Sequence, residues 1–137
     1  MIPVWFLAAA GLLLQATQSV ASDFTSVEEV RPILAATHGS WVSIHEADGQ
    51  DLVYFTQILS WRCPIAVLRY GLNGADPMTE FPMEPCHFDY STPSVQFGDD
   101  IFIRQPGGSV QSIHIVIEYH DGSQDEAVLQ RGAILSK

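Results

Sequence analysis

The sequence has few basic residues. It contains six Lys plus Arg against 16 Asp plus Glu, which gives a formal net charge of −10 over 137 residues. Six dispersed cations are too few to neutralise a phosphate backbone, so a basic nucleic-acid binder is excluded. The length predicts one small domain and excludes a multidomain enzyme. No apolar run reaches the roughly 20 residues that a membrane-spanning helix needs, which also excludes a polytopic membrane protein.

Ordered catalytic motifs are also missing. No serine lies in a Gly-x-Ser-x-Gly elbow, and no glycine-rich phosphate loop is present. We therefore expect no cofactor, and we favour a function without catalysis. A catalytic site assembled in space from distant residues is left open.

The amino-terminal segment has the pattern of an export signal. Val4–Leu14 is an unbroken apolar run of eleven residues, and Ser19 and Ala21 put small residues at the −3 and −1 positions before Ser22. The pattern predicts a cleaved signal peptide (1–21) and an exported domain (22–137) that keeps every charged side chain and has no membrane span. The alternative is an uncleaved anchor or a buried helix.

The compartment follows from the same segment. We expect export to a bacterial periplasm or to the extracellular space. The absence of an Asn-x-Ser/Thr sequon favours the periplasm, whereas the lack of Lys or Arg before the apolar run argues against it. The acidic domain should repel nucleic acid and anionic lipid surfaces.

The two cysteines, Cys63 and Cys86, predict one disulfide in an exported domain. Closing a loop of about 24 residues stabilises a small domain by roughly 3 kcal/mol. A catalytic thiol at Cys86 beside His87 is the alternative. It is disfavoured because neighbouring residues of an extended chain point in opposite directions.

Period-two alternation dominates the chain after residue 40 and predicts a mostly β fold. The clearest run is Ser112–His120, with apolar residues on one face and polar residues on the other. Asp48-Gly49 and Asp121-Gly122 are hairpin signals, and Gln105–Gly108 is typical of a type II turn. These features predict a small antiparallel β-sandwich or a partly open barrel. About six strands are expected, at residues 41–46, 52–61, 65–70, 101–104, 112–120 and 126–131.

Three segments need separate interpretations. Ser26 and Glu29 have capping-box spacing, so a helix should begin here; either it ends near Arg31 and restarts at Pro32, or one kinked helix runs to about Thr37. The 52–61 run is apolar on both faces, which predicts a central strand covered on both sides. Residues 75–99 predict a long packed loop that a Cys63–Cys86 bond would fasten to the sheet.

Gly39-Ser40-Trp41, at the start of the first predicted strand, resembles the Gly-x-Trp signature of the lipocalins. The resemblance covers three residues. It implies an eight-stranded exported barrel that carries a small apolar ligand. In this chain the implied pocket would be lined by aromatic residues of the first two strands: Trp41, Tyr54, Phe55 and Trp61.

One strand face has residues that bind metals elsewhere. His114, Glu118 and His120 alternate along the 112–120 strand, and imidazole and carboxylate groups are common zinc ligands. Alternation alone also puts polar residues on this face, so a solvated surface is the competing explanation.

Taken together, these observations favour an acidic, exported, non-catalytic binding or interaction module. Its partner would be a protein or a small molecule, and the 75–99 loop would make the contacts. The alternative is a lipocalin-like carrier of a small apolar ligand. A metal-binding or hydrolytic protein is less favoured.

Overall fold

The computed structural model describes residues 3, 10–13 and 23–137. The predicted cleavage site before Ser22 therefore lies outside the described residues, as does most of the predicted signal peptide. Within the described residues, no helix is both long enough and apolar enough to cross a membrane.

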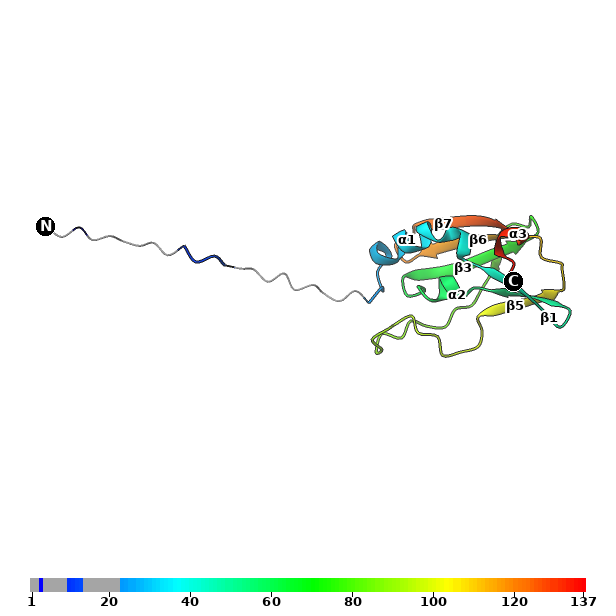
Figure 1. The fold of residues 1–137 in the computed structure, drawn as a ribbon, viewed down its shortest axis with the longest axis horizontal. Helices are drawn as coiled ribbons and strands as arrows, with labels where there is room; N and C mark the ends of the chain where they lie inside the picture. Colours follow the sequence, from blue (N-terminus) through cyan, green and yellow to red (C-terminus); the bar gives the residue numbers. More distant parts are fainter. Residues whose placement is uncertain (1–2, 4–9, 14–22) are drawn as a thin grey trace.

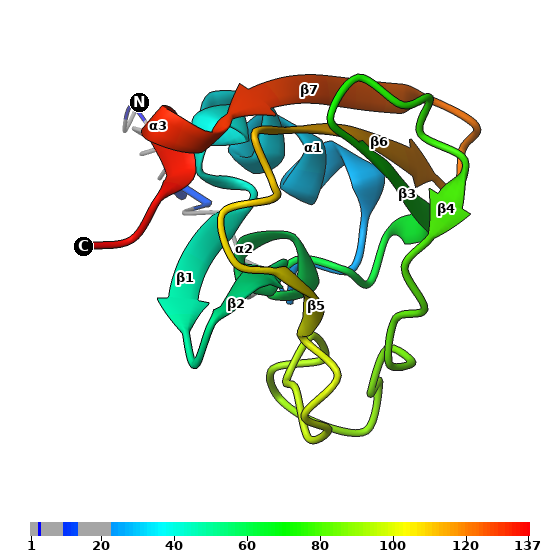
Figure 2. The same ribbon diagram turned by 90° about the vertical axis from the view of Figure 1, so that its right-hand side faces the viewer.

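Within the described residues, seven strands form two antiparallel sheets, which agrees with the predicted sandwich; the strand at Thr79–Glu80 lies inside the predicted 75–99 loop and was not expected. One sheet has three strands in the order β1-β2-β5, and the other has four in the order β4-β3-β6-β7. The two sheets form separate layers, and the structure is not a closed barrel (Figure 2). The barrel implied by the lipocalin resemblance is therefore wrong. The strands are β1 (Ser43–Ala47), β2 (Gln50–Tyr54), β3 (Ile65–Leu72), β4 (Thr79–Glu80), β5 (Phe102–Pro106), β6 (Ser112–Tyr119) and β7 (Gln124–Gln130).

The alternation in β6 defines the core face of the larger sheet. Its three isoleucines and Tyr119 are all buried, while the residues between them are only half-buried. β6 lies between β3 and β7, and β7 returns from the Asp121-Gly122 turn as predicted. Gly122 has a φ of 84°, a conformation that glycine adopts without a steric penalty.

The amino-terminal helix is one continuous element, so the second alternative for this segment is confirmed. α1 (Val27–Ala36) begins after Ser26, whose hydroxyl accepts a hydrogen bond from the Glu29 N–H, and Pro32 lies inside it. α1 is followed by the 3₁₀ turn η1 (His38–Ser40). Val30 and Leu34 face the core, and Arg31 binds Asp125 on β7, which places α1 against the four-stranded sheet (Figure 1).

The prediction of a strand over 52–61 is wrong in its second half. β2 ends at Tyr54 and the short helix α2 (Thr56–Leu59) follows. Pairing ends here because Tyr54 faces the first residue of β1 on one side and the first residue of β5 on the other. Beyond it, Phe55, Ile58 and Leu59 are buried at a spacing of three and four residues, which is helical.

The turn after β5 is displaced by one residue from its predicted position. Ser109 N–H donates to the Pro106 carbonyl at 3.0 Å, and Gly108, not Gly107, has the positive φ, of 74°. Gly107 has another constraint, because its N–H donates to the Gly49 carbonyl and a Cβ would lie 2.7 Å from that oxygen. This tight contact between Gly107 and Gly49 fixes how the turn after β5 lies against the turn between β1 and β2.

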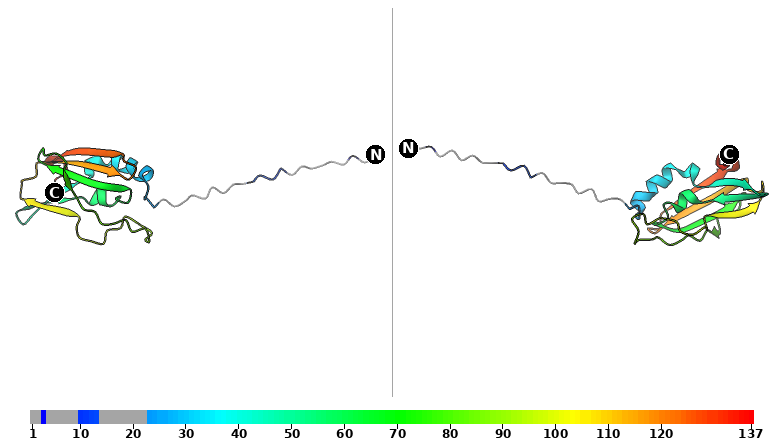
Figure 3. Two further views of the ribbon diagram at one scale, coloured as in Figure 1. Left: turned by 180° about the vertical axis from the view of Figure 1, so that it is seen from behind. Right: turned by 60° about the horizontal axis from the view of Figure 1, so that its bottom comes forward.

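The sandwich has two sides, each formed by one edge strand from each sheet: β1 and β7 on one side, and β4 and β5 on the other. On one side, α3 (Arg131–Ile134) follows β7, and Leu135 then forms a bridge with Ile44 of β1. On the other side, the edge strands β4 and β5 belong to different sheets, and the chain between them is the larger part of the predicted 75–99 loop, continued to Ile101. This loop lies at one margin of the domain in both views of Figure 3.

Candidate functional site

The predicted disulfide is present and fastens the long loop to the chain just before β3. Cys63 and Cys86 are bonded, with their Cα atoms 5.0 Å apart. Neither cysteine is free, so the alternative of a catalytic thiol at Cys86 is wrong. The loop is held on the side of the domain where β4 and β5 are the edge strands of the two sheets.

A buried arginine organises the loop around its guanidinium group. Arg62 is only 2% exposed and comes directly before Cys63. Burial lowers the pKa of Arg62, and the nearby Glu84 carboxylate opposes this effect. The guanidinium donates to five carbonyl oxygens at 2.5–3.1 Å, those of Leu59, Glu84, Pro85, Ser94 and Val95. A single side chain therefore connects α2 with both arms of the loop.

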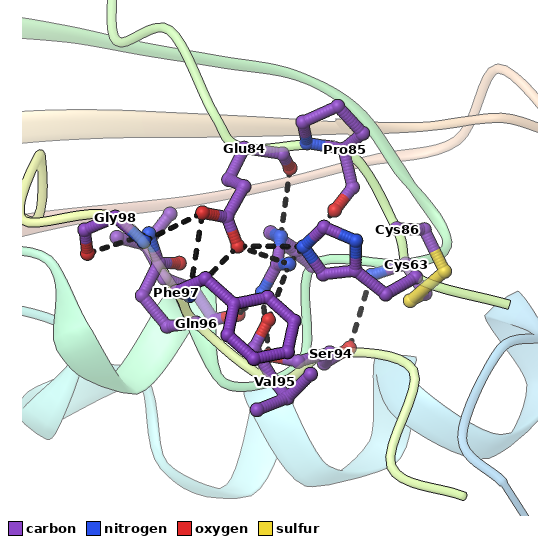
Figure 4. A network of polar contacts seen from close by, with 12 residues as sticks. Cys63, Glu84, Pro85, Cys86, Ser94, Val95, Gln96, Phe97 and Gly98 are labelled. Atoms are coloured by element: carbon purple, nitrogen blue, oxygen red, sulfur yellow. Dashed lines mark hydrogen bonds and ion pairs between the residues drawn. A yellow bond between two sulfur atoms is a disulfide. The ribbon is translucent and has the colours of Figure 1, made fainter. Parts of the chain in front are cut away.

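The Glu84 carboxylate makes a second set of contacts across the loop (Figure 4). It accepts hydrogen bonds from the backbone N–H groups of Phe97 and Gly98 at 3.0 Å and 2.7 Å. It also contacts Arg62 at 3.3 Å and the His87 Nε2 atom at 2.8 Å. The hydrogen bonds from the Phe97 N–H, from His87 and from the Gly98 N–H stabilise the charged form and lower the pKa of Glu84 to about 2.

Three aromatic rings contact one another on the outer surface of the loop. The ring of His87 lies 4.9 Å from that of Phe97 and 6.0 Å from that of Tyr90, and the Tyr90 and Phe97 rings are 5.1 Å apart. Tyr90 and Phe97 are 54% and 58% exposed, and neighbouring Phe88 is 72% exposed. We call Phe88, Tyr90 and Phe97, with the edge of His87, the aromatic loop surface. Because Glu84 binds both His87 and the Phe97 N–H, the network beneath positions this surface.

A cleft of about 460 Å³ lies between α2 and the later part of the loop. Leu59, Val95 and Ile101 provide its apolar lining, with hydroxyl groups of Thr56, Ser60 and Thr92 beside them. Its volume is in the range of small-molecule pockets, roughly 300–1,000 Å³.

The four aromatic residues of the predicted ligand pocket do not share one face. Trp41 and Phe55 are buried in the core, where the Trp41 Nε1–H donates to the Leu34 carbonyl at 2.8 Å. Tyr54, the residue before Phe55, points to the other face of the sheet, where its ring contacts those of His45 and Phe102. Trp61 contacts Phe24. The cleft beside α2 is lined by other residues.

Two of the three predicted metal ligands bind separate partners on the outer face of the larger sheet. His114 contacts Glu126 at 2.8 Å, and Glu118 binds Arg69 at 2.9 Å, while His120 follows the end of β6. His114 and Glu118 are four residues apart on a strand, a distance of about 13 Å. Among the described residues, no group of three or more His, Cys, Asp or Glu side chains is arranged to hold a metal ion.

A second buried charge lies in the 3-stranded sheet and was missed by sequence reasoning. Asp51 is fully buried, accepts hydrogen bonds from the Gly108 and Val110 N–H groups, and binds both Nη atoms of Arg131 at 2.6 Å and 3.1 Å. The Arg131 hydrogen bonds are the main reason why the pKa of Asp51 lies far below its usual range. The group is structural, because its acceptors are all engaged within the domain.

Comparison with known proteins adds no relatives. The chain matches no protein-family model, no curated protein and no solved structure. Its function has to be inferred from its own residues.

Proposed function

We propose that this chain is a non-catalytic binding module of an exported protein, and that it holds a polypeptide partner on its aromatic loop surface. The observation that carries the proposal is the contact among His87, Tyr90 and Phe97 on the outside of a firmly held loop. The disulfide and the apolar amino-terminal run support export.

Exposed rings of this kind are costly in water unless a partner covers them. Scattered apolar side chains are normal on a surface, but contiguous ones are typical of interaction sites. Tyr and Phe are also enriched at interfaces, where they bring large contact areas with little loss of rotamer freedom. The aromatic loop surface has three such rings within one short stretch of chain.

The network beneath the surface favours binding without a large entropic cost. Arg62, Glu84 and the disulfide hold the loop from three directions before any partner arrives. A surface held in its binding conformation loses less conformational entropy on association than a mobile loop does. The 75–99 loop can therefore bind a partner although it has little regular secondary structure.

The proposal is tested with a random-peptide display library, using the oxidised protein as bait. We expect enriched peptides whose capture is lost in the double variant Tyr90→Ser/Phe97→Ser. Val128→Ser is the matched control, because Val128 is 59% exposed on β7, away from the loop. Enrichment that the double variant and the wild type share would contradict the proposal. Hydrolytic turnover that disappears on one His or Asp substitution would contradict the non-catalytic assignment.

A second candidate function, carriage of a small apolar molecule, is favoured by the cleft beside α2. Ser60 lies exposed in its lining, so Ser60→Trp should fill the cleft without disturbing the core. A neutral apolar dye such as Nile red should then bind the wild type saturably and the variant poorly. Ser91→Trp, at an exposed position outside the cleft lining, is the control. Equal dye binding by all three proteins would remove this candidate.

A further inference from the structure

We propose that the partner held by the aromatic loop surface is a cationic polypeptide segment, whose Arg or Lys side chains lie over the Tyr90 and Phe97 rings. The inference rests on the proposed function and adds the chemistry of the partner. It follows from where the charges of the chain lie and from how its own arginines pack.

Negative charge is concentrated in the part of the chain that contains the rings. Residues 70–103, between Arg69 and Arg104, contain six acidic side chains and no Lys or Arg. This stretch of about a quarter of the chain thus contributes −6 of the formal net charge of −10. A partner approaching the loop meets one sign of charge, which favours the encounter of a positively charged segment.

Most of these carboxylates have no cation of their own. Within the described residues, Glu84 is the one carboxylate of this stretch that forms an ion pair with an arginine, Arg62; it also contacts His87. Asp89 stands between Phe88 and Tyr90, and Asp99 and Asp100 follow Phe97 closely; all three are exposed. Exposed carboxylates without an ion pair therefore lie close to the rings in the sequence of both arms of the loop.

Apart from Arg62, which pairs with Glu84, the arginines of the chain are engaged away from the carboxylates of this stretch. Arg31, Arg69 and Arg131 form ion pairs with carboxylates outside residues 70–103. Arg62 is buried beneath the loop, and Arg104 binds Gln50 on the neighbouring strand. The other carboxylates of the loop are therefore left without an arginine partner among the described residues.

Two of these arginines pack on aromatic rings in the way we propose for the partner. The Arg104 Cζ atom lies 5.0 Å from the centre of the Phe102 ring, and the Arg31 Cζ atom lies 5.8 Å from that of Tyr119. A cation over a ring face is attracted by the ring's quadrupole, most strongly where water is displaced. Tyr90 and Phe97 are more than half exposed and are available for such a contact. An anionic partner would meet unfavourable charges beside the same rings.

The test has two readouts. In the display experiment above, the loop-dependent peptides should be enriched in Arg and Lys. A synthetic peptide of alternating Arg and Ser is then titrated into the oxidised full chain by calorimetry, beside a peptide of alternating Glu and Ser. We expect the Arg peptide to bind and the Glu peptide not to bind, with weaker binding as sodium chloride rises from about 25 mM to about 250 mM.

Variants separate the contribution of the rings from that of charge alone. Tyr90→Ser/Phe97→Ser should weaken binding of the Arg peptide by about tenfold or more at both salt concentrations, whereas Val128→Ser should leave it unchanged. Asp89→Asn/Asp99→Asn/Asp100→Asn should weaken it mainly at low salt. Equal binding of the Arg and Glu peptides, or of the wild type and the ring variant, would overturn the inference. Loop-dependent peptides without Arg or Lys enrichment would overturn it too, while leaving the proposed function standing.

Discussion

Replacing Arg62 with Met should destabilise the domain more than any substitution of a surface arginine. The guanidinium donates six hydrogen bonds in a buried position, five of them to carbonyl oxygens and one to the Glu84 carboxylate. Met keeps the apolar stem but none of the donors. The five acceptors are backbone carbonyl groups, which remain in the variant. Each must then accept a hydrogen bond from water or stay unpaired in a buried position.

The size of the effect follows from the burial of the group. A net hydrogen bond from a charged donor contributes about 1.5–3 kcal/mol, but six bonds from one side chain are not additive. Removing one partner of a buried ion pair costs about 3–5 kcal/mol. Part of the loop can open to water and limit the loss, so we expect a total of about 3–5 kcal/mol. This is a large share of the roughly 5–15 kcal/mol that stabilises a small domain.

Arg69→Met is the matched control. Arg69 lies on β3 and forms an ion pair with Glu118, but the two side chains are 32% and 33% exposed. Such surface pairs contribute about 0.2–1 kcal/mol. Both variants should be unfolded in urea at neutral pH with the disulfide intact, and followed by far-ultraviolet circular dichroism. Hydrogen exchange at the Phe97 and Gly98 amides, which bind Glu84, adds a local readout.

The reasoning fails if the two variants differ by less than about 1 kcal/mol and if exchange at the two amides is also unchanged. A smaller urea m-value for Arg62→Met, together with fast exchange at these amides, would locate the loss in an opened loop. A lower midpoint with an unchanged m-value would place it in global stability.

Three further predictions concern charge and covalent bonding. Acid should destabilise the domain as pH falls from about 5 to about 2, because the pKa of Glu84 is about 2 and that of Asp51 is lowered as well. The Tm is measured over this pH range for the wild type and for Glu84→Gln. A Tm that falls as steeply in the variant as in the wild type would contradict the role of Glu84. Asp51→Asn should cost about 3–5 kcal/mol in urea unfolding, since it leaves Arg131 without its buried partner; a loss below about 1 kcal/mol would refute this. Cys63→Ser/Cys86→Ser should lose roughly 3 kcal/mol in the same assay and keep its β-type circular dichroism spectrum, and an unchanged urea midpoint would count against it.

The sequence predicted the parts of the fold that depend on local pattern. The Ser112–His120 run, the hairpin glycines and the capping residue Ser26 were all placed correctly, because a period of two, a positive φ and a cap each leave a signal in neighbouring residues. The disulfide was predicted because only one pairing was available. The boundary at Tyr54 was missed because the apolar residues after it fit both periods over so short a run.

The parts that failed depend on contacts between distant segments. Arg62 lies beside Trp61 and Cys63 in the sequence, and nothing there indicates that all but one of its partners are 22 to 33 residues away. Asp51 follows a hairpin turn, where a solvated carboxylate is ordinary, yet Arg131 binds it from 80 residues further along. The length of the 75–99 loop was a correct signal of anchoring, but the contacts among its rings became visible only in three dimensions.

The two open sides of the sandwich show why the loop side is the better candidate for binding. On the β1 side, the bridge between Leu135 and Ile44 and the ion pair between Arg131 and Asp51 join α3 and the chain after it to the three-stranded sheet. On the β4–β5 side, the connection runs through a long loop, and its anchoring arginine is directed inwards to carbonyl oxygens. Because Arg62 binds the carbonyl oxygens of both arms of the loop, the rings of Tyr90 and Phe97 are not needed to hold the loop in place. Their exposure is therefore better explained by a partner than by the stability of the fold.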